Sequence, residues 1–506
     1  MTGEPRVACY KQNLPADAPT ILTLDAGSSS VRTVLFDAKG RRVDGFGAQL
    51  PYAFDTTPDG GVQIDPGRLV DLCVKALAAA CVQLAYADIR PVAVACDTFW
   101  HSVLGLDSDG RPATPLLHLL DTRSEEAAAK LRRRIDDRAQ HARTGCVLHS
   151  SYLPSKLLWL SDTQPDAFRR VVRWMSIGEY LFLKLLGTAM ASTSMVSASG
   201  LWDQNRNDYD DELLSVLPVR RGQFPDPAAM DQPLSNLLPD FKESLSRLDG
   251  IPWYPALGDG ACDNLGSGCV SPENFALMVG TTGAMRAVFE REQLDIPAGL
   301  WCYRVDRRRA VLGGAISSGG EVFAWMKQTL QLPDPAETEK QIAAMSPGAH
   351  GLTLLPYFAG ERSPGWRSDA RAAIAGIGVA TTPLHILRAA LESVALQFRG
   401  IYDIMQVSIA RPARIIASGG ALLHSPAWTC MMADALSRPV LACLEPEATA
   451  RGAALLALEK IGVIGDIRDA PPRTGQFYEP VASHWDIYSE ELRRQRVLYH
   501  RLFEER

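Results

Sequence analysis

Several features that would point to other classes of protein are missing from this sequence of 506 residues. The formal net charge is −6 and no block of basic residues occurs, so nucleic acid is not an expected partner. There is no run of about 20 apolar residues of the kind that spans a membrane. The N-terminal segment also lacks the apolar core of a signal peptide. We therefore expect a cytoplasmic enzyme with no nucleic-acid or membrane partner.

Metal-binding cysteine patterns are also missing. The chain has ten cysteines, but no two of them form a CxxC pair. Scattered cysteines in a chain without a secretory signal are most often small buried side chains of a reduced protein. The composition is that of a globular protein, and 506 residues are too many for one hydrophobic core, so we expect at least two domains.

One short pattern occurs twice, once in each half of the chain. "GSSSVRTVLFD" runs from Gly27 to Asp37, and "GTTGAMRAVFE" runs from Gly280 to Glu290. Each copy begins with a glycine and two hydroxyl residues and lies between stretches typical of β-strands. Glycine lets backbone N–H groups point at one position, and the hydroxyls add donors, as in loops that bind phosphate. The repeat predicts two phosphate-binding turns that hold one nucleotide across a cleft.

An acidic residue precedes the first turn but not the second. Asp25 stands two residues before Gly27, whereas Met278 stands two residues before Gly280. A carboxylate at the end of a strand can hold Mg²⁺ through water beside the phosphates, so we assign the metal to Asp25. The alternative is an aspartate that only initiates the turn.

Strands and helices alternate along the chain, which is typical of an α/β fold. Residues 66–86 have helical spacing with a proline in the first turn, and residues 91–96 are typical of a buried strand. In the second half, glycine pairs open helices after two strands, and a helix near residues 448–462 is followed by a charged tail. A loop-rich region at residues 217–255 marks the expected boundary. We expect domains 1–255 and 256–506 built on a duplicated core.

Five segments together resemble the FGGY carbohydrate kinases of the actin-like ATPase superfamily, in the family's order. They are "LDAGSSSVRTVLFD", "GDGACDNLG", "GTTGAMR", "GERSPGW" and "SGGALLHSPAWTCMMAD". The resemblance covers the chain from about Thr20 to Gly462. It implies a two-domain actin-like ATPase (ribonuclease H-like) fold with ATP in the interdomain cleft, and transfer of phosphate to a sugar with Mg²⁺. It is also consistent with a homodimer.

The resemblance implies roles for individual residues. Asp259 would be the general base that accepts the proton of the attacking sugar hydroxyl, with Asp263 as the competing acid. Arg32 would lie near the γ-phosphate, and its alternative is a surface arginine on a strand. The other nucleotide contacts would come from Gly27, Ser28, Ser29, Thr281, Thr282, Gly320 and Gly420. Gly320 could instead only begin a helix, and His424 departs from the amide residue that some members place at the adenine edge.

The segment "FWHSVLGLDSDGRPATPLLHLLDTRS" resembles the sugar-binding stretch of xylulose and gluconate kinases. Trp100 and His101 would line the substrate pocket together with Asp259. A buried core histidine is the alternative reading of His101. Trp100 stands where the family has methionine, and Leu119 stands where tryptophan is common, so both changes reshape the pocket.

Several segments favour gluconate as the substrate. They are "SIGEYLFLKLLG", "SASGLW", "GERSPGWRSDAR" and "TTGAMR". Arg286, in the last of these, could clamp the carboxylate of gluconate, and a structural role is its alternative. The other candidate activities are a xylulokinase or another ketose or polyol kinase. An actin-like ATPase without a sugar substrate is disfavoured, because it would have no small-sugar pocket.

Overall fold

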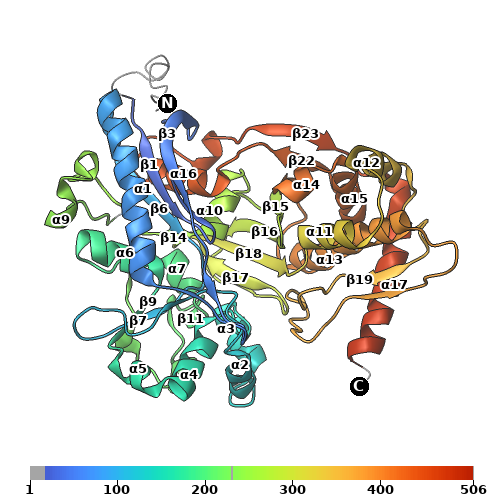
Figure 1. The fold of residues 1–506 in the computed structure, drawn as a ribbon, viewed down its shortest axis with the longest axis horizontal. Helices are drawn as coiled ribbons and strands as arrows, with labels where there is room; N and C mark the ends of the chain where they lie inside the picture. Colours follow the sequence, from blue (N-terminus) through green and yellow to red (C-terminus); the bar gives the residue numbers. More distant parts are fainter. Residues whose placement is uncertain (1–17, 229–231, 505–506) are drawn as a thin grey trace.

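The structure is a computed structural model that describes residues 18–228 and 232–504. Its described part contains two large β-sheets with helices packed on their faces (Figure 1). The nine cysteines in this part are all free, and only Cys430 is exposed, as the sequence predicted. The expected two-domain α/β architecture is confirmed.

The first sheet has mixed strand directions. In spatial order its strands are β14 (Leu257–Gly258), β6 (Ala93–Thr98), β1 (Ile21–Ala26), β2 (Ser30–Phe36) and β3 (Arg42–Pro51). Strands β1 and β2 form the predicted hairpin around Gly27, with Asp25 opposite Arg32. Strand β6 lies parallel to β1, and β14 lies parallel to β6. The carboxyl ends of β1, β6 and β14 therefore meet at one edge of the sheet.

The second sheet repeats this arrangement. In spatial order its strands are β17 (Trp301–Arg304), β18 (Arg309–Ile316), β16 (Gly283–Glu290), β15 (Asn274–Val279), β21 (Arg414–Ser418), β22 (Val440–Cys443) and β23 (Thr474–Tyr478). The strands β18, β16, β15, β21 and β22 have the same order and directions as β3, β2, β1, β6 and β14. The duplicated core that the two turns predicted is therefore present.

Helices cover both sheets (Figure 1). Those of the first half include α1 (Pro66–Ala87), α2 (Glu125–Arg132), α3 (Asp137–Thr144), α4 (Leu153–Thr163), α6 (Ile177–Leu186) and α7 (Thr193–Ser197). Those of the second half include α10 (Asp259–Gly266), α11 (Gly320–Thr329), α12 (Pro335–Ala344), α13 (Pro383–Ser408), α14 (Gly420–Leu423), α15 (Pro426–Leu436), α16 (Ala448–Lys460) and α17 (Trp485–Phe503). Helix α1 is long and apolar enough to cross a membrane, but its apolar side is buried in the core of the first half, as in a core helix.

The charged tail expected after residue 462 is in fact ordered as β23 and α17. Four residues of the tail, Tyr488, Leu492, Tyr499 and Phe503, recur at helical spacing and pack against the cores of the second half. The many charged residues between them made this helical spacing hard to recognise in the sequence. The amphipathic pattern, rather than the charge, decides the structure here.

Two corresponding helices cross where the halves meet. Helix α10 follows β14, helix α16 follows β22, and the two are in direct contact. A Cβ on Gly266 would lie 1.7 Å from the carbonyl oxygen of Ala448, and a Cβ on Gly452 would lie 1.9 Å from that of Cys262. The backbones can approach this closely only because both positions are glycine.

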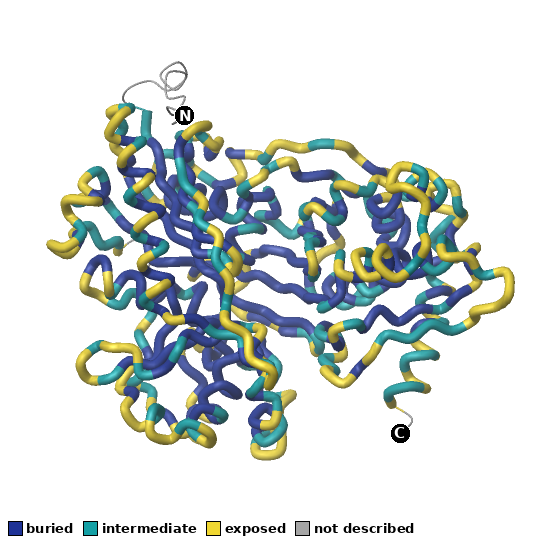
Figure 2. The backbone as a smooth tube through the Cα atoms, viewed as in Figure 1, coloured by how far each residue is buried: buried dark blue, intermediate teal, exposed yellow. Residues whose placement is uncertain are grey.

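The buried arginine of α16 joins the two halves further. Arg451 donates to the carbonyl oxygens of Gly40, at 2.9 Å, and Gly266, at 2.6 Å. Figure 2 shows most strands of both sheets as buried, whereas the edge strands β3 and β23 carry exposed residues. One hydrophobic cluster combines residues of both halves, including Trp100, Leu265 and Leu455. The halves therefore share a packed interface.

The strand β14 lies just beyond the expected boundary at residue 255. It is hydrogen-bonded to β6, so the first residues of the second half complete the first sheet. The division at residue 255 stays a prediction, and a division after α10 would keep this sheet intact.

Candidate active site

Three aspartates meet at the edge formed by the carboxyl ends of β1, β6 and β14. Asp25 and Asp97 are neighbours in register on adjacent parallel strands. Asp259 follows β14 directly and begins α10, and its charge acts on the other two carboxyl groups. The fold thus gathers three acids whose positions in the sequence are far apart.

Asp97 was missed in the sequence, although it directly follows the strand predicted at residues 91–96 and directly precedes the "TFWHS" segment. Its side chain is fully buried, and no described N–H or hydroxyl donor reaches either carboxylate oxygen. Burial and the adjacent Asp25 carboxylate raise the pKa of Asp97 well above its usual range. Burial also raises the pKa of Asp25. Two facing carboxyl groups without donors are favourable only with a shared proton or a bound cation.

Asp259 is placed by its two flanking glycines. A Cβ on Gly258 or Gly260 would lie only 1.7 Å or 2.4 Å from atoms of the Trp100 indole ring. The carboxylate of Asp259 accepts the N–H of Gly260 at 2.8 Å. Removal from water raises the pKa of Asp259, and the hydrogen bond and the Arg286 charge partly offset this. The "GDG" sequence therefore holds a carboxylate against the ring of Trp100.

Arg286 holds helix α10 in place. Its Nη1 donates to Asp263 at 2.8 Å, to the carbonyl oxygen of Gly260 at 3.1 Å and to Asn264 at 3.3 Å. Its side chain is 6% exposed. This geometry supports the structural role of Arg286, which the sequence left as an alternative. The ion pair also favours Asp259 over Asp263 as the base, because Asp263 already has a cationic partner.

Both predicted phosphate turns use the N–H of their first glycine in an internal hydrogen bond. The N–H of Gly27 donates to Ser30 at 3.1 Å, and that of Gly280 donates to Thr282 at 2.9 Å. The glycine N–H groups are therefore used within the turns. Ser28, Ser29 and Thr281 are exposed. The donors left for a ligand are those of the hydroxyl residues rather than those of the glycines.

Three segments pack together beside the second turn. The N–H of Gly320 donates to Gly280 at 2.8 Å, and a Cβ on Gly320 would lie 2.7 Å from the Cβ of Ala421. Gly419 has φ +90°, and a Cβ there would lie 2.4 Å from the carbonyl oxygen of Val279. At Gly420, by contrast, a Cβ would make only ordinary contact. The packing requires glycine at Gly320 and Gly419, whereas it does not require glycine at Gly420.

A cavity of about 400 Å³ adjoins α14. Its lining includes Gly420, His424, Phe323 and Trp428. Its position beside the second turn and its partly apolar lining suit a nucleoside. His424, the residue that departs from the family's amide, lies in this cavity.

Arg32 is engaged in an ion pair between the two halves. It donates to Glu447, the residue before α16, at 3.2 Å and to Ser30 Oγ at 3.0 Å. The ion pair places the guanidinium beside the first turn and within reach of the Asp25 charge. The role at the γ-phosphate stays a prediction.

Aromatic rings from both halves surround the predicted sugar residues. Trp100 lies 5.1 Å from Tyr303, and His101 lies 4.8 Å from Tyr152, measured between ring centroids. The hydroxyls of Tyr152 and Tyr303 are hydrogen-bonded at 2.7 Å, which connects the two halves directly. Trp100 donates its indole N–H to the carbonyl oxygen of Ser194 at 3.2 Å. The structure packs Trp100 against the glycines on both sides of Asp259, and the role of Trp100 and His101 in binding a sugar stays a prediction.

His101 presents one free acceptor to this pocket. Its Nδ1 lies 2.7 Å from the carbonyl oxygen of Ala198, so this nitrogen carries the proton. Burial lowers the pKa of His101 to about 3, so the ring is neutral near pH 7. The other nitrogen, Nε2, can then accept a hydrogen bond from a hydroxyl group. His101 also has φ +63°, a backbone conformation that non-glycine residues rarely adopt.

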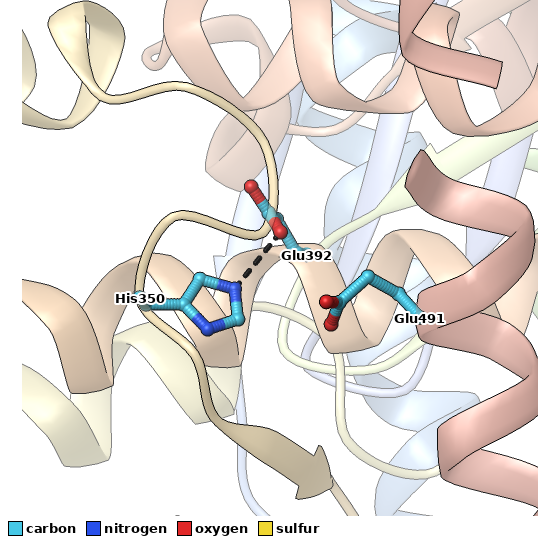
Figure 3. Close-up of side chains that lie close together, drawn as sticks. All are labelled: His350, Glu392 and Glu491. Atoms are coloured by element: carbon cyan, nitrogen blue, oxygen red, sulfur yellow. Dashed lines mark hydrogen bonds and ion pairs between the residues drawn. The ribbon is translucent and has the colours of Figure 1, made fainter. Parts of the chain in front are cut away.

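A second cluster of ligating side chains lies between α13, α17 and the loop at residues 348–352. Figure 3 shows His350, Glu392 and Glu491 close together. The N–H of Leu352 donates to His350 Nδ1 at 3.0 Å, so the proton is on Nε2, which donates to Glu392 at 3.0 Å. His350 therefore has no lone pair free for a metal, and each glutamate also pairs with an arginine on its own helix. The cluster anchors α17.

Comparisons with known proteins agree with this geometry. The N-terminal domain of the FGGY family of carbohydrate kinases matches residues 20–266, and its C-terminal domain matches residues 275–459. The gluconokinase of Bacillus licheniformis is 27% identical over 459 residues, which are 88% of each chain. The glycerol kinase of Leptothrix cholodnii is 30% identical over 463 residues, which are 88% of this chain and 91% of that one.

Solved structures show the same fold. The gluconate kinase of Lactobacillus acidophilus has a TM-score of 0.88 at 24% identity, and the match covers 96% of this chain and 98% of that one. A ligand-bound xylulose kinase of the same organism has a TM-score of 0.89 at the same identity and coverage. With both family domains matched in order over most of its length, the chain belongs to the FGGY family of carbohydrate kinases.

Proposed function

We propose that this ATP-dependent sugar kinase phosphorylates gluconate or a closely related open-chain polyhydroxy acid. The observation that carries the chemistry is the position of Asp259, whose charge acts on Asp25 before the first turn and whose flanking glycines pack against the ring of Trp100. The substrate is supported by two relatives named gluconokinase, which are 27% and 26% identical over 88% and 90% of this chain. Both relatives are matched over most of their own length.

In this proposal Asp259 accepts the proton of the sugar hydroxyl as its oxygen attacks the γ-phosphorus. A hydroxyl has a pKa far above 7, so the attack needs a base within hydrogen-bond reach. A raised pKa makes the Asp259 carboxylate a stronger base than an exposed aspartate. The ring of Trp100 and the contact with Gly260 fix the carboxylate, so little reorganisation is needed in the reaction.

The sugar would lie between the two halves. Its carbon chain would contact the ring of Trp100, and one hydroxyl would donate to His101 Nε2. Because Tyr152 and Tyr303 join opposite halves at this pocket, a bound sugar favours the closed arrangement. Closure excludes water that would otherwise accept the phosphoryl group.

The nucleotide would be bound mainly by the second half. The hydroxyl groups of the exposed Ser28, Ser29 and Thr281 and of the half-buried Thr282 would contact phosphate oxygens, and the base would enter the cavity beside Gly420. A structurally similar glycerol kinase of Plasmodium falciparum, with a TM-score of 0.83, was solved with ADP. In this arrangement the nucleotide would lie beside the second turn and the cavity next to α14.

The paired carboxyl groups of Asp25 and Asp97 fit Mg²⁺. Their oxygens are hard ligands, and those of Asp97 have no described donor, so a divalent cation would relieve the repulsion between them. When bound, Mg²⁺ offsets charge on the phosphate oxygens. We assign the metal to Asp25, with Asp97 as a supporting carboxylate, and we expect a homodimer, which light scattering of the purified protein would test.

A coupled assay of ADP release over sugar acids, ketoses and polyols tests the substrate. We expect the highest kcat/KM with gluconate or a related acid. The panel includes glycerol and xylulose, because a glycerol kinase is 30% identical to this chain and a xylulose kinase is 22% identical. A clear preference for a neutral sugar would reject the acid substrate and leave the kinase chemistry in place.

A further inference from the structure

One arginine near the sugar pocket has no partner in the described part of the chain. Arg362 lies in the "GERSPGW" segment, and its half-buried guanidinium makes no hydrogen bond or ion pair with any described residue. Its Nε is fully buried without an acceptor, and its nearest ring contact is with Trp366 at 5.8 Å. A guanidinium has five N–H donors, and leaving them unused away from water is costly. The side chain is therefore available to a ligand.

The loop that carries Arg362 is held rigidly. The N–H of Ser363 donates to Ala315 on β18 at 2.9 Å, and Ser363 Oγ accepts the N–H of Ala315 at 3.2 Å. Trp366 donates its indole N–H to the carbonyl oxygen of Gly299 at 2.8 Å. These bonds fix the loop on both sides of its cis proline, at Ser363 and at the ring of Trp366, before any ligand binds.

A chain of ring contacts leads from Arg362 to the sugar pocket. The ring of Trp366 lies 6.3 Å from that of Tyr152, which lies 4.8 Å from that of His101. The positive charge of Arg362 also contributes to lowering the pKa of His101 and of His149. Arg362 is therefore within electrostatic reach of the residue that we assign to the sugar.

A second basic side chain acts on the same two histidines. Lys156 is fully buried and donates to the carbonyl oxygens of Ser150 and Ser151, both at 2.8 Å, with no carboxylate at ion-pair distance in the described residues. Burial lowers the pKa of Lys156 to about 7, and Asp121, the nearest acid to act on it, is paired with Arg123 at 2.6 Å. The Lys156 charge also acts on His101.

Acidic and basic side chains therefore form two separate groups near Trp100 and His101. Asp25, Asp97 and Asp259 gather where β1, β6 and β14 end, whereas the charges of Arg362 and Lys156 both act on His101, and neither has a carboxylate at ion-pair distance among the described residues. Arg286, the arginine first considered for a substrate carboxylate, is already bound to Asp263. A substrate with a carboxylate at one end and a reacting hydroxyl at the other would match this distribution.

We propose that Arg362 binds the carboxylate of the substrate and thereby selects a sugar acid over a neutral polyol. The proposal rests on the proposed function, because it assigns an end of the same substrate. The planar guanidinium can donate two parallel hydrogen bonds to a carboxylate, which a neutral amide or hydroxymethyl group cannot accept equally well.

The test compares Arg362→Gln with the wild type on gluconate and on gluconamide, which replaces the carboxylate by a neutral group of similar shape. We expect the KM for gluconate to rise roughly 10- to 100-fold, since a charge-assisted hydrogen bond is lost. The KM for gluconamide should change by less than about threefold, with kcat similar for both. Arg371→Gln is the matched control, because Arg371 is exposed and donates only to nearby carbonyl oxygens.

The outcomes separate the two proposals. If the wild type phosphorylates gluconate but Arg362→Gln affects both compounds equally, or neither, the role of Arg362 is wrong and the proposed function stands. If the wild type phosphorylates only neutral sugars, the acid substrate itself is wrong. Should Arg362→Gln melt early, Arg362→Lys with calorimetric titration of gluconate and gluconamide replaces it. For Arg362→Lys we expect a smaller loss of affinity, and only for gluconate. An equal change in affinity for both compounds would overturn the proposal.

Discussion

The indole ring of Trp100 occupies the space that a side chain at Gly260 would need. A Cβ at Gly260 would lie 2.4 Å from Cζ3 of the ring. Because Gly260 follows Asp259, this contact couples the wall of the sugar pocket to the proposed base.

Gly260→Ala should disturb both residues. Overpacking of this kind costs roughly 1–3 kcal/mol, and we expect kcat/KM to fall at least about tenfold as the ring or the carboxylate moves. Steady-state kinetics of Gly260→Ala, Trp100→Met and the double variant measure the effect. The smaller methionine should restore part of the loss in the double variant. Additive losses would show that the two positions are not coupled through this contact.

The metal assignment predicts a specific defect in Asp25→Ala. Removing this carboxylate should weaken the Mg²⁺ dependence of ATP turnover while leaving sugar binding nearly unchanged, because the sugar contacts lie elsewhere. Asp97→Asn should produce a smaller change in the same direction. Titration of activity with Mg²⁺ at saturating sugar measures both. Saturation curves that coincide with the wild type would reject the assignment.

Because α10 and α16 cross closely, we expect a methyl group added at the crossing to destabilise the protein. Gly452→Ala would bring a Cβ within 1.9 Å of the carbonyl oxygen of Cys262, so the helices must separate. We expect a loss of roughly 1–3 kcal/mol in the free energy of unfolding. Gly400→Ala in α13 is the matched control, because a Cβ there meets nothing within 4 Å. It should be neutral or stabilising by up to about 1 kcal/mol. Equal urea midpoints for the two variants would contradict the close crossing.

Because Glu179 is buried, we expect the stability of the protein to depend on pH. Its side chain is buried at the start of α6, and burial raises its pKa from 4.5 to about 7. The unfolded chain loses this proton near pH 4.5, whereas the folded chain keeps it until about pH 7. This group therefore lowers the free energy of unfolding as the pH rises from about 4.5 to 7, by up to about 3 kcal/mol.

Glu179→Gln cannot ionise, so its stability should fall less over this range. Urea unfolding of the wild type and the variant between pH 5 and pH 8 provides the comparison. The difference between them should grow with pH in favour of the variant. A constant difference across the range would mean that Glu179 ionises normally in the folded protein.

Local patterns in the sequence predicted the parts of the site that lie on turns. The two glycine-hydroxyl turns fall between the strands where they were expected, because both glycines close a tight hairpin. Asp97 could not be assigned from the sequence, because its relation to Asp25 depends on pairing between strands distant in the chain. The same holds for Arg286 and Arg362. Both are arginines in family motifs, and only the packing decides which one already has a carboxylate partner.

Asp259→Asn tests the role of Asp259 as the general base. The amide keeps the shape of the side chain but cannot accept the proton. We therefore predict that kcat with the best sugar acid falls by roughly 10²–10⁴ while the affinity for ADP, measured by calorimetry, stays within about twofold. Near-normal turnover in this variant, with ADP affinity unchanged, would contradict the account.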